Sequence, residues 1–447
     1  VNYQRETFTS FTDQVVITRI TADKPGMITF NATLTSPHQD VVITSEGNDI
    51  TLSGVSSQHE GLKGKVQFQG RVTAKTKGGE LICRDGVLSV KGADEAIVYA
   101  SIGTNFNNYK DITGDFEARA KGYLEKALPH PYAEAKKSHT DFYQKQINTA
   151  SLYLGEDQYP NVTTDKRVER FAETNDAFLV ATYFKFGRYL LISCSQPGGQ
   201  AANLQGIWNN IDVVAWNSDI HSNINVQMNY WPAETTNLSE MHMPFLNYIW
   251  NMAVNHNEWQ KWAQLQGQDR GWTCYTENNI FGGVSAFKNN YVIANAWYAT
   301  HLWQHYRYTL DYDFLKKVFP AMLSASQFWM DRVKLASDGT YEAPNEWSPE
   351  HGPESQNGVA HAQQLIYDLF GNTLEAISIL GGDASISADD LSKLKDRFQK
   401  LDKGLATETY RGTWGTSALA AGSKIMREWK YSPYSAGENG HRHMSHL

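Results

Sequence analysis

The chain has 447 residues, which exceeds the usual size of one domain and predicts at least two. Its 40 basic and 48 acidic side chains give a formal net charge of −8 with no basic tract, which argues against a nucleic-acid partner. No apolar run approaches the roughly 18 to 20 residues of a membrane span, so we expect none.

The cysteine and aromatic content restricts the class of protein less than the length and charge do. Cys83, Cys194 and Cys274 lie far apart and lack metal or redox spacing, so a disulfide framework is not expected. The 13 Trp and 23 Tyr are consistent with stacking on sugar rings and equally with a large helical core. The first residues, VNYQRETFTSF, carry neither an initiator Met nor a signal-peptide pattern, so we expect a removed leader or a longer parent chain.

The first part of the chain, residues 1–112, predicts an antiparallel β-sandwich. Short segments rich in β-branched residues are separated by Gly, Asp, Asn and Pro at turn spacing. These segments are VVITRI (15–20), MITFNATL (27–34), VVIT (41–44), KVQFQGRVTA (65–74), VLSV (87–90) and AIVYASI (96–102). Strands in series without a helical period are typical of a sandwich.

From about Asp115 the pattern becomes helical. Residues 113–163 predict exposed helices of mixed charge that act as a linker. Over residues 164–447 apolar residues recur at helical spacing, and loops dense in Trp, Asn, Gly and His separate the helices. This alternation predicts an α/α toroid whose loops line a sugar-sized cleft, because binding groups gather on the connections of a rigid scaffold.

Among the carboxylates, Glu350 in the segment SPEHG is the first candidate for chemistry. Trp347 and Pro349 lie close in sequence, and an apolar environment raises the pKa of a carboxyl, which would make Glu350 a proton donor at neutral pH. Glu346 and Glu354 are rivals on the same loop. An exposed acidic residue without a catalytic role is the alternative interpretation.

Two amides stand out in the segment HSNINVQMNYWPAE. Asn223 and Asn225 point to the same side if the segment is extended, so both could converge on one small ligand. Each amide presents an acceptor and two donors, which suits the orientation of a water or a sugar hydroxyl. The alternative is that they cap a helix beginning near Gln227.

The segment HRHMSHL at residues 441–447 forms a third group. His441, Arg442 and His443 lack zinc spacing and are better suited to hydrogen bonding with sugar hydroxyls, although a solvated polar segment is an alternative. The sequence has no G-x-S-x-G, no P-loop and no G-x-G-x-x-G. It therefore predicts neither a serine hydrolase nor a nucleotide-binding protein, and it predicts no metal and no cofactor.

Taken together, four segments resemble glycoside hydrolase family 95, the inverting 1,2-α-L-fucosidase family. They are NLQGIWNN (203–210), NINVQMNYWPAETTNLSE (223–240), SPEHG (348–352) and HRHMSHL (441–447). The resemblance runs in order along essentially the whole chain. It implies an N-terminal sandwich, a helical linker and an (α/α)6 barrel that holds the active site.

The resemblance also implies roles for individual residues. Glu350 takes the part of the general acid, and Asn223 and Asn225 help to activate the attacking water. The positions implied in substrate binding are His221, Arg442 and His443, with Glu277 as a further binding carboxylate and Trp297 or Tyr291 as the stacking face.

One part of the family pattern is missing from this chain. The family's general base is an aspartate in a later loop that contains Gly-Asn-Phe-Gly, and relatives also carry sequence before the position of Val1. We therefore expect the central portion of a larger enzyme, with an incomplete barrel. An inverting site needs two carboxyl groups roughly 6.5 to 9.5 Å apart.

The expected function is exo-acting, inverting release of terminal α-1,2-linked L-fucose from a fucosylated oligosaccharide or glycan. Such an enzyme suits a secreted or periplasmic location, and the oligomeric state is not predicted. The alternatives are an α-L-galactosidase of the same family, a glycan-binding homologue without activity, and an inverting phosphorylase.

Overall fold

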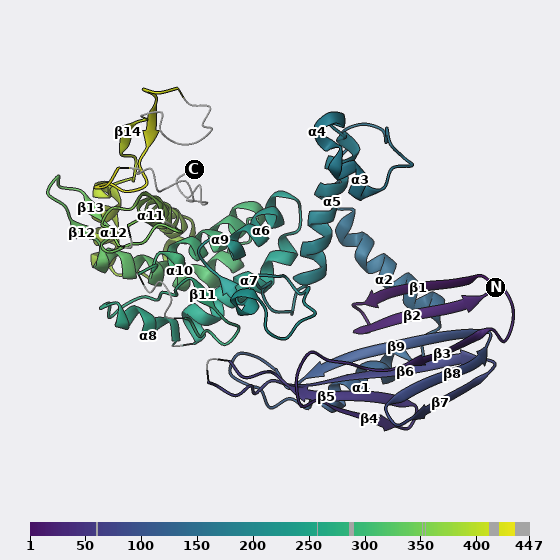
Figure 1. Cartoon of the computed structure of the whole chain (residues 1–447). Coiled ribbons are helices and arrows are strands. Elements are labelled where there is room, and N and C mark those ends of the chain that lie inside the picture. The colour runs from purple at the N-terminus through teal and green to yellow at the C-terminus, as the bar shows by residue number, and fades with distance from the viewer. Residues whose placement is uncertain are drawn as a thin grey trace. The chain divides into compact units, whose positions relative to one another are not determined.

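A computed structural model describes residues 1–59, 61–256, 258–285, 290–350, 352–353, 355–410 and 420–433 (Figure 1). Arg442, His443 and Glu354 lie outside the described residues. The chain divides into two compact units: Val1–Thr149 with Asn209–Ala215, and Ala150–Trp208 with Trp216–Leu447.

The first unit contains two antiparallel sheets, which confirms the predicted sandwich. The six-stranded sheet has the order β1-β2-β9-β6-β5-β4 and the three-stranded sheet the order β3-β8-β7 (Figure 1). The strands are β1 (Tyr3–Ser10), β2 (Val15–Ala22), β3 (Ile28–Ala32), β4 (Val42–Glu46), β5 (Asp49–Val55), β6 (Gln67–Lys77), β7 (Glu80–Arg84), β8 (Val87–Ala93) and β9 (Glu95–Thr104).

Strand β9 shows how alternation builds two cores on one sheet. Ala96 packs with Ile50 and Leu88 in one apolar cluster, whereas the next residue, Ile97, packs with Leu124 in another. Successive side chains of a strand point to opposite faces, so the six-stranded sheet is covered on both sides.

Two helices cover the second face of the six-stranded sheet. They are α1 (Phe116–Ala127) and α2 (Tyr132–Ile147). The side chain of Asp115 caps α1 by accepting a hydrogen bond from the N–H of Ala118 at 2.9 Å. Leu124 and Ala127 of α1 and Ala135 of α2 are buried against the sheet. The helices expected as a linker therefore belong to the same compact unit as the sandwich.

The second unit is helical, with short strands in its loops. Its helices are α3 (Thr164–Glu169), α4 (Phe171–Thr174), α5 (Ala177–Cys194), α6 (Asn225–Thr235), α7 (Ser239–Trp250), α8 (Glu258–Leu265), α9 (Ala294–Thr309), α10 (Tyr312–Arg332), α11 (Ala360–Leu380) and α12 (Ala388–Lys400). Its short strands are β10 (Ile220–His221), β11 (Glu277–Asn278), β12 (Lys334–Leu335), β13 (Tyr341–Glu342), β14 (Thr407–Thr409) and β15 (Lys424–Met426).

The connections between these helices alternate between short and long. Short turns join α6 to α7, α9 to α10 and α11 to α12, whereas the long connections 195–224, 266–293 and 333–359 lead into α6, α9 and α11. Helix α9 contacts both α6 and α11. This order is that of an (α/α)6 barrel, in which the long loops gather at the end where the inner helices begin.

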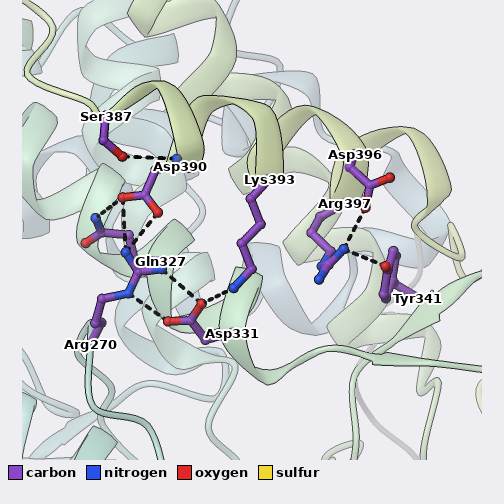
Figure 2. Close-up of polar contacts among 9 residues, drawn as sticks. All are labelled: Arg270, Gln327, Asp331, Tyr341, Ser387, Asp390, Lys393, Asp396 and Arg397. Atoms are coloured by element: carbon purple, nitrogen blue, oxygen red, sulfur yellow. Dashed lines mark hydrogen bonds and ion pairs between the residues drawn. The ribbon is translucent and has the colours of Figure 1, made fainter.

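A network of charged side chains fastens α12 to α10 (Figure 2). The guanidinium of Arg270 donates to both carboxylate oxygens of Asp331, at 2.8 and 2.9 Å, and to those of Asp390, at 2.9 and 3.0 Å. Gln327 donates to Asp390 at 3.0 Å, and Lys393 pairs with Asp331. Bidentate arginine contacts of this kind fix geometry as well as adding free energy.

Helix α5 has the length and composition of a membrane span, with a mean hydropathy of 1.2 over 18 residues of which 17% are buried. One such helix is weak evidence for a membrane. The buried Arg188 within it donates a hydrogen bond to the carbonyl of Ala150 at 2.9 Å, which is a contact of a folded protein interior.

Candidate active site

His221 and Glu277, identified separately in the sequence, face each other across the strand pair β10–β11. The Nε2 atom of His221 lies 3.8 Å from Glu277 Oε1 and 2.8 Å from Asp219 Oδ1. Asp219 belongs to no motif recognised in the sequence. Its contact with His221 depends on the turn before β10. The three side chains form a polar, partly buried group, with side-chain exposures of 11, 17 and 18% for His221, Asp219 and Glu277.

The contact between His221 and Asp219 has the distance but not the angle of a hydrogen bond. Consequently His221 Nε2 and Asp219 Oδ1 are both buried atoms without a hydrogen-bond partner among the described residues. Buried polar atoms in proteins are nearly always satisfied, so an exception points to a bound ligand or water.

The amide pair lies directly after this group. Residues 222–224 form a turn and not an extended segment, and α6 begins at Asn225, two residues before the expected start near Gln227. The N-cap residue is Ile224, and no side chain caps the helix. Neither Asn223 nor Asn225 makes a side-chain hydrogen bond within the described part of the chain. Their amides are therefore not used for capping, and both keep their capacity for a ligand.

The turn that carries Asn223 is held from several sides. The Ser222 carbonyl accepts from Gln227 Nε2 at 2.6 Å and from the Tyr291 hydroxyl at 3.5 Å. The Ser222 hydroxyl donates to the carbonyl of Tyr275 at 2.5 Å. These contacts fix the backbone on which the amide sits, as precise positioning of a ligand requires.

Aromatic side chains connect this turn with the loop of Glu350. Tyr291 stacks on His361, with ring centroids 5.8 Å apart, and its hydroxyl lies 3.1 Å from His361 Nε2. Its edge meets Trp347 at 6.3 Å. Because Tyr291 is fully buried, the suggestion that it offers a stacking face is wrong. Trp297 is partly exposed and stays the candidate.

The loop between α10 and α11 carries the candidate acid. Glu346 and Gln356 form an antiparallel bridge, with N–O distances of 2.8 and 2.9 Å, which closes the base of the loop that carries Glu350. Glu350 is exposed on this loop, whereas Glu346 is fully buried. The expectation that Glu350 is desolvated is therefore wrong, and the desolvated carboxyl of this loop is that of Glu346.

Burial raises the pKa of Glu346 to about 8, against the influence of Arg332 and of the N–H groups of Val292 and Ile293. Arg332 lies 3.7 Å from its carboxylate. Neither carboxylate oxygen of Glu346 has a hydrogen-bond partner among the described residues. Glu350 is the exposed carboxyl of the same loop.

A cavity of about 500 Å³ lies on another side of the same loop. It is lined by Leu265, Gln266, Gln268, Asn290, Arg332, Lys334, Pro344, Asn345 and Ser355. None of the residues expected to bind substrate lines it, so this cavity is not the predicted sugar site. A buried set of potential metal ligands also lies elsewhere, on α6, α7 and α9.

A sandwich followed by a helical barrel, with paired amides at the start of α6 and an exposed carboxyl on a barrel loop, defines a carbohydrate-active class of protein. Residues 131–447 match the model of the glycosyl hydrolase family 95 catalytic domain, and residues 1–109 match that of the glycosyl hydrolase family 65 N-terminal domain. The chain belongs to glycosyl hydrolase family 95.

Two curated relatives match the whole chain. "Alpha-L-fucosidase 2" of Arabidopsis thaliana is 30% identical over 100% of this chain, and "Probable alpha-fucosidase A" of Aspergillus niger is 29% identical over 99%. The chain spans 56% of the length of each. A solved structure, "Putative kojibiose phosphorylase from human microbiome", shares the fold, with a TM-score of 0.59 and 12% identity over 90% of this chain and 53% of that one.

Proposed function

We propose that the protein containing this chain is an exo-acting glycoside hydrolase that releases terminal α-1,2-linked L-fucose from glycans with inversion. The observation that carries the proposal is the amide pair Asn223 and Asn225, placed beside His221 and left without hydrogen-bond partners among the described residues. Membership of the family and the names of the two relatives support a fucosidase-type hydrolase.

In the proposed mechanism Glu350 donates a proton to the glycosidic oxygen while a water attacks the opposite face of the sugar. The carbonyl oxygens of Asn223 and Asn225 accept hydrogen bonds from that water and orient it. The proton of the water passes to a carboxylate base roughly 6.5 to 9.5 Å from the acid. By the family resemblance this base is an aspartate of a loop that contains Gly-Asn-Phe-Gly.

Substrate recognition in this proposal comes from polar groups around one ring. The unsatisfied Nε2 of His221 and the carboxylates of Asp219 and Glu277 bond the sugar hydroxyls. Trp297 supplies an apolar face, since aromatic rings pack on the C–H face of a sugar. Arg442 and His443 add donors by the resemblance alone.

The deciding experiment is a time-resolved NMR assay of the longer protein on an α-1,2-fucosylated oligosaccharide. The initial product is expected to be β-L-fucose. Initial α-L-fucose would contradict inversion, and binding of L-fucose without hydrolysis would indicate a glycan-binding protein. Comparison of kcat/KM on aryl α-L-fucoside and α-L-galactoside decides the sugar, because a pocket rejects an added hydroxyl strongly only if it is tightly packed there.

We also propose a secreted or periplasmic location, because polymeric or glycan-bound fucose is encountered outside the cytoplasm. Cell fractionation with an antibody against the protein tests this proposal. Recovery in the cytoplasmic fraction would contradict it.

A further inference from the structure

The interior of the helical unit holds a carboxylate and three imidazoles that the proposed mechanism does not use. Glu234 lies on α6, His242 on α7, and His301 and His305 one turn apart on α9. Their exposed fractions are 7, 0, 1 and 6%. Buried ionisable groups are rare unless they are paired or bind a metal, so this set calls for an explanation.

One oxygen is the centre of the set. Glu234 Oε1 lies 2.7 Å from Nδ1 of His242 and 2.7 Å from Nδ1 of His305. The three atoms all lie within 4.8 Å of one another. Two imidazole nitrogens and one carboxylate oxygen are a ligand set that Zn²⁺ uses in proteins.

A second layer of contacts orients two of these three side chains. The Ser239 hydroxyl donates to Glu234 Oε2 at 2.5 Å, and His301 Nδ1 lies 2.9 Å from His242 Nε2. In metal sites the outer atom of each ligand is held in this way, which fixes the tautomer and the direction of the inner atom.

The surroundings of the set are apolar and closed. The ring of Tyr230 stacks on His242 with centroids 5.4 Å apart, and Phe314 meets His305 at 4.5 Å. Phe245 lies against His242 and His301. An apolar shell lowers the local dielectric and strengthens any charge interaction inside it.

We propose that Glu234 Oε1, His242 Nδ1 and His305 Nδ1 bind a divalent transition-metal ion of the Zn²⁺ type, which cross-links α6, α7 and α9. The ion takes the place of the protons between the two Nδ1 atoms and the carboxylate, and each imidazole then carries its proton on Nε2. Bonds of about 2.0 Å in a tetrahedral site place ligand atoms roughly 3.3 Å apart, so each contact lengthens by about half an ångström. Binding of an ion by these three side chains does not rest on the fucosidase proposal.

Co²⁺ titration of the chelator-treated 447-residue chain tests the proposal. We expect one Co²⁺ per chain, with the visible absorption of a four-coordinate site, and displacement by Zn²⁺ with a rise in Tm. Glu234→Gln and His305→Gln are expected to abolish the absorption, while His130→Gln, at an exposed histidine of the first unit, keeps it.

Ser239→Ala keeps all three ligands, so it tests the site even if the ligand variants fail to fold. It is expected to preserve the 1:1 stoichiometry and to weaken Co²⁺ affinity by about 10-fold, the usual effect of removing an outer contact. Absence of stoichiometric Co²⁺ binding by the unmodified chain would overturn the proposal. So would absorption that persists in a folded His305→Gln chain, because the ion would then occupy surface histidines.

Discussion

The side chain of Ser348 donates a hydrogen bond to the carboxylate of Glu428, 80 residues further along the chain. Both residues are fully buried, and Ser348 lies two positions before Glu350. The backbone carbonyl of Glu428 also accepts from the N–H of Ala360, where α11 begins, at 2.9 Å. Glu428 therefore holds the base of the candidate acid loop against the start of an inner helix.

Removing this bond is expected to impair catalysis more than binding. In the longer protein, Ser348→Ala should lower kcat by roughly 10- to 100-fold with little change in KM, because a small misplacement of a reacting group is costly. Steady-state kinetics on an aryl α-L-fucoside provides the measurement. The same substitution at Ser385, exposed between α11 and α12, is the control. Equal turnover of both variants would show that the bond does not position Glu350.

Replacement of the candidate acid itself should have a larger effect. Glu350→Gln is expected to reduce kcat by about 10²-fold or more on substrates with a poor leaving group, since general acid catalysis supplies about that much. Glu350 is exposed, so the Tm of the variant should match that of the parent. Near-normal turnover on an oligosaccharide substrate would remove Glu350 from the role of acid.

A third amide, Asn229, serves to distinguish a catalytic role of Asn223 and Asn225 from a structural one. Asn223→Ala and Asn225→Ala should lower kcat strongly, yet leave the free energy of unfolding within about 1 kcal/mol, because neither amide is hydrogen-bonded in the described chain. Asn229 donates to the carbonyl of Asn203 at 3.1 Å, so Asn229→Ala should destabilise the fold instead. Urea denaturation together with kinetics makes the comparison. A large loss of stability in Asn223→Ala would support a purely structural amide.

The buried carboxyl of Glu346 should make stability depend on pH. Its pKa is raised from 4.5 to about 8 by burial, so the folded chain binds this proton more tightly than the unfolded chain. The contribution of Glu346 to stability is full below about pH 4.5 and is lost as the pH rises through about 8. The two pKa values correspond to a loss on the order of 3 to 5 kcal/mol.

Glu346→Gln removes the titrating group and should flatten this decline. Urea denaturation of both chains at about pH 5 and about pH 9 measures it. Glu117→Gln, at an exposed position of α1, controls for the loss of one acidic residue. If the difference in free energy of unfolding between the parent and Glu346→Gln is the same at both pH values, the raised pKa is contradicted.

The network around Arg270 predicts a smaller, salt-sensitive effect. Arg270→Met removes four charge-assisted hydrogen bonds to Asp331 and Asp390 (Figure 2). The guanidinium is 38% exposed, so solvent screening limits the loss to roughly 1 kcal/mol. Denaturation at low and high ionic strength should show the difference between the parent and the variant shrinking with salt. A difference independent of salt would assign it to packing of the arginine stem.

Local patterns allowed much of the fold to be predicted. The strands of the sandwich and the helices after Asp115 follow from side-chain periodicity, which one segment displays by itself. The pattern could not show that α1 and α2 pack on the sheet, because their burial depends on the apolar face that the sheet presents. For the same reason it misjudged the turn before α6, whose shape is set by contacts of Ser222 with Tyr275 and Tyr291.

By itself, the sequence determined the family and the residue types available for chemistry, since motif segments such as NINVQMNYWPAE and SPEHG are local. Only the tertiary structure decided which of these residues meet. It paired His221 with Glu277, it buried Glu346 while exposing Glu350, and it gathered the set around Glu234 from three helices. Burial and proximity arise from contacts between residues tens of positions apart, and no single segment of the chain encodes them.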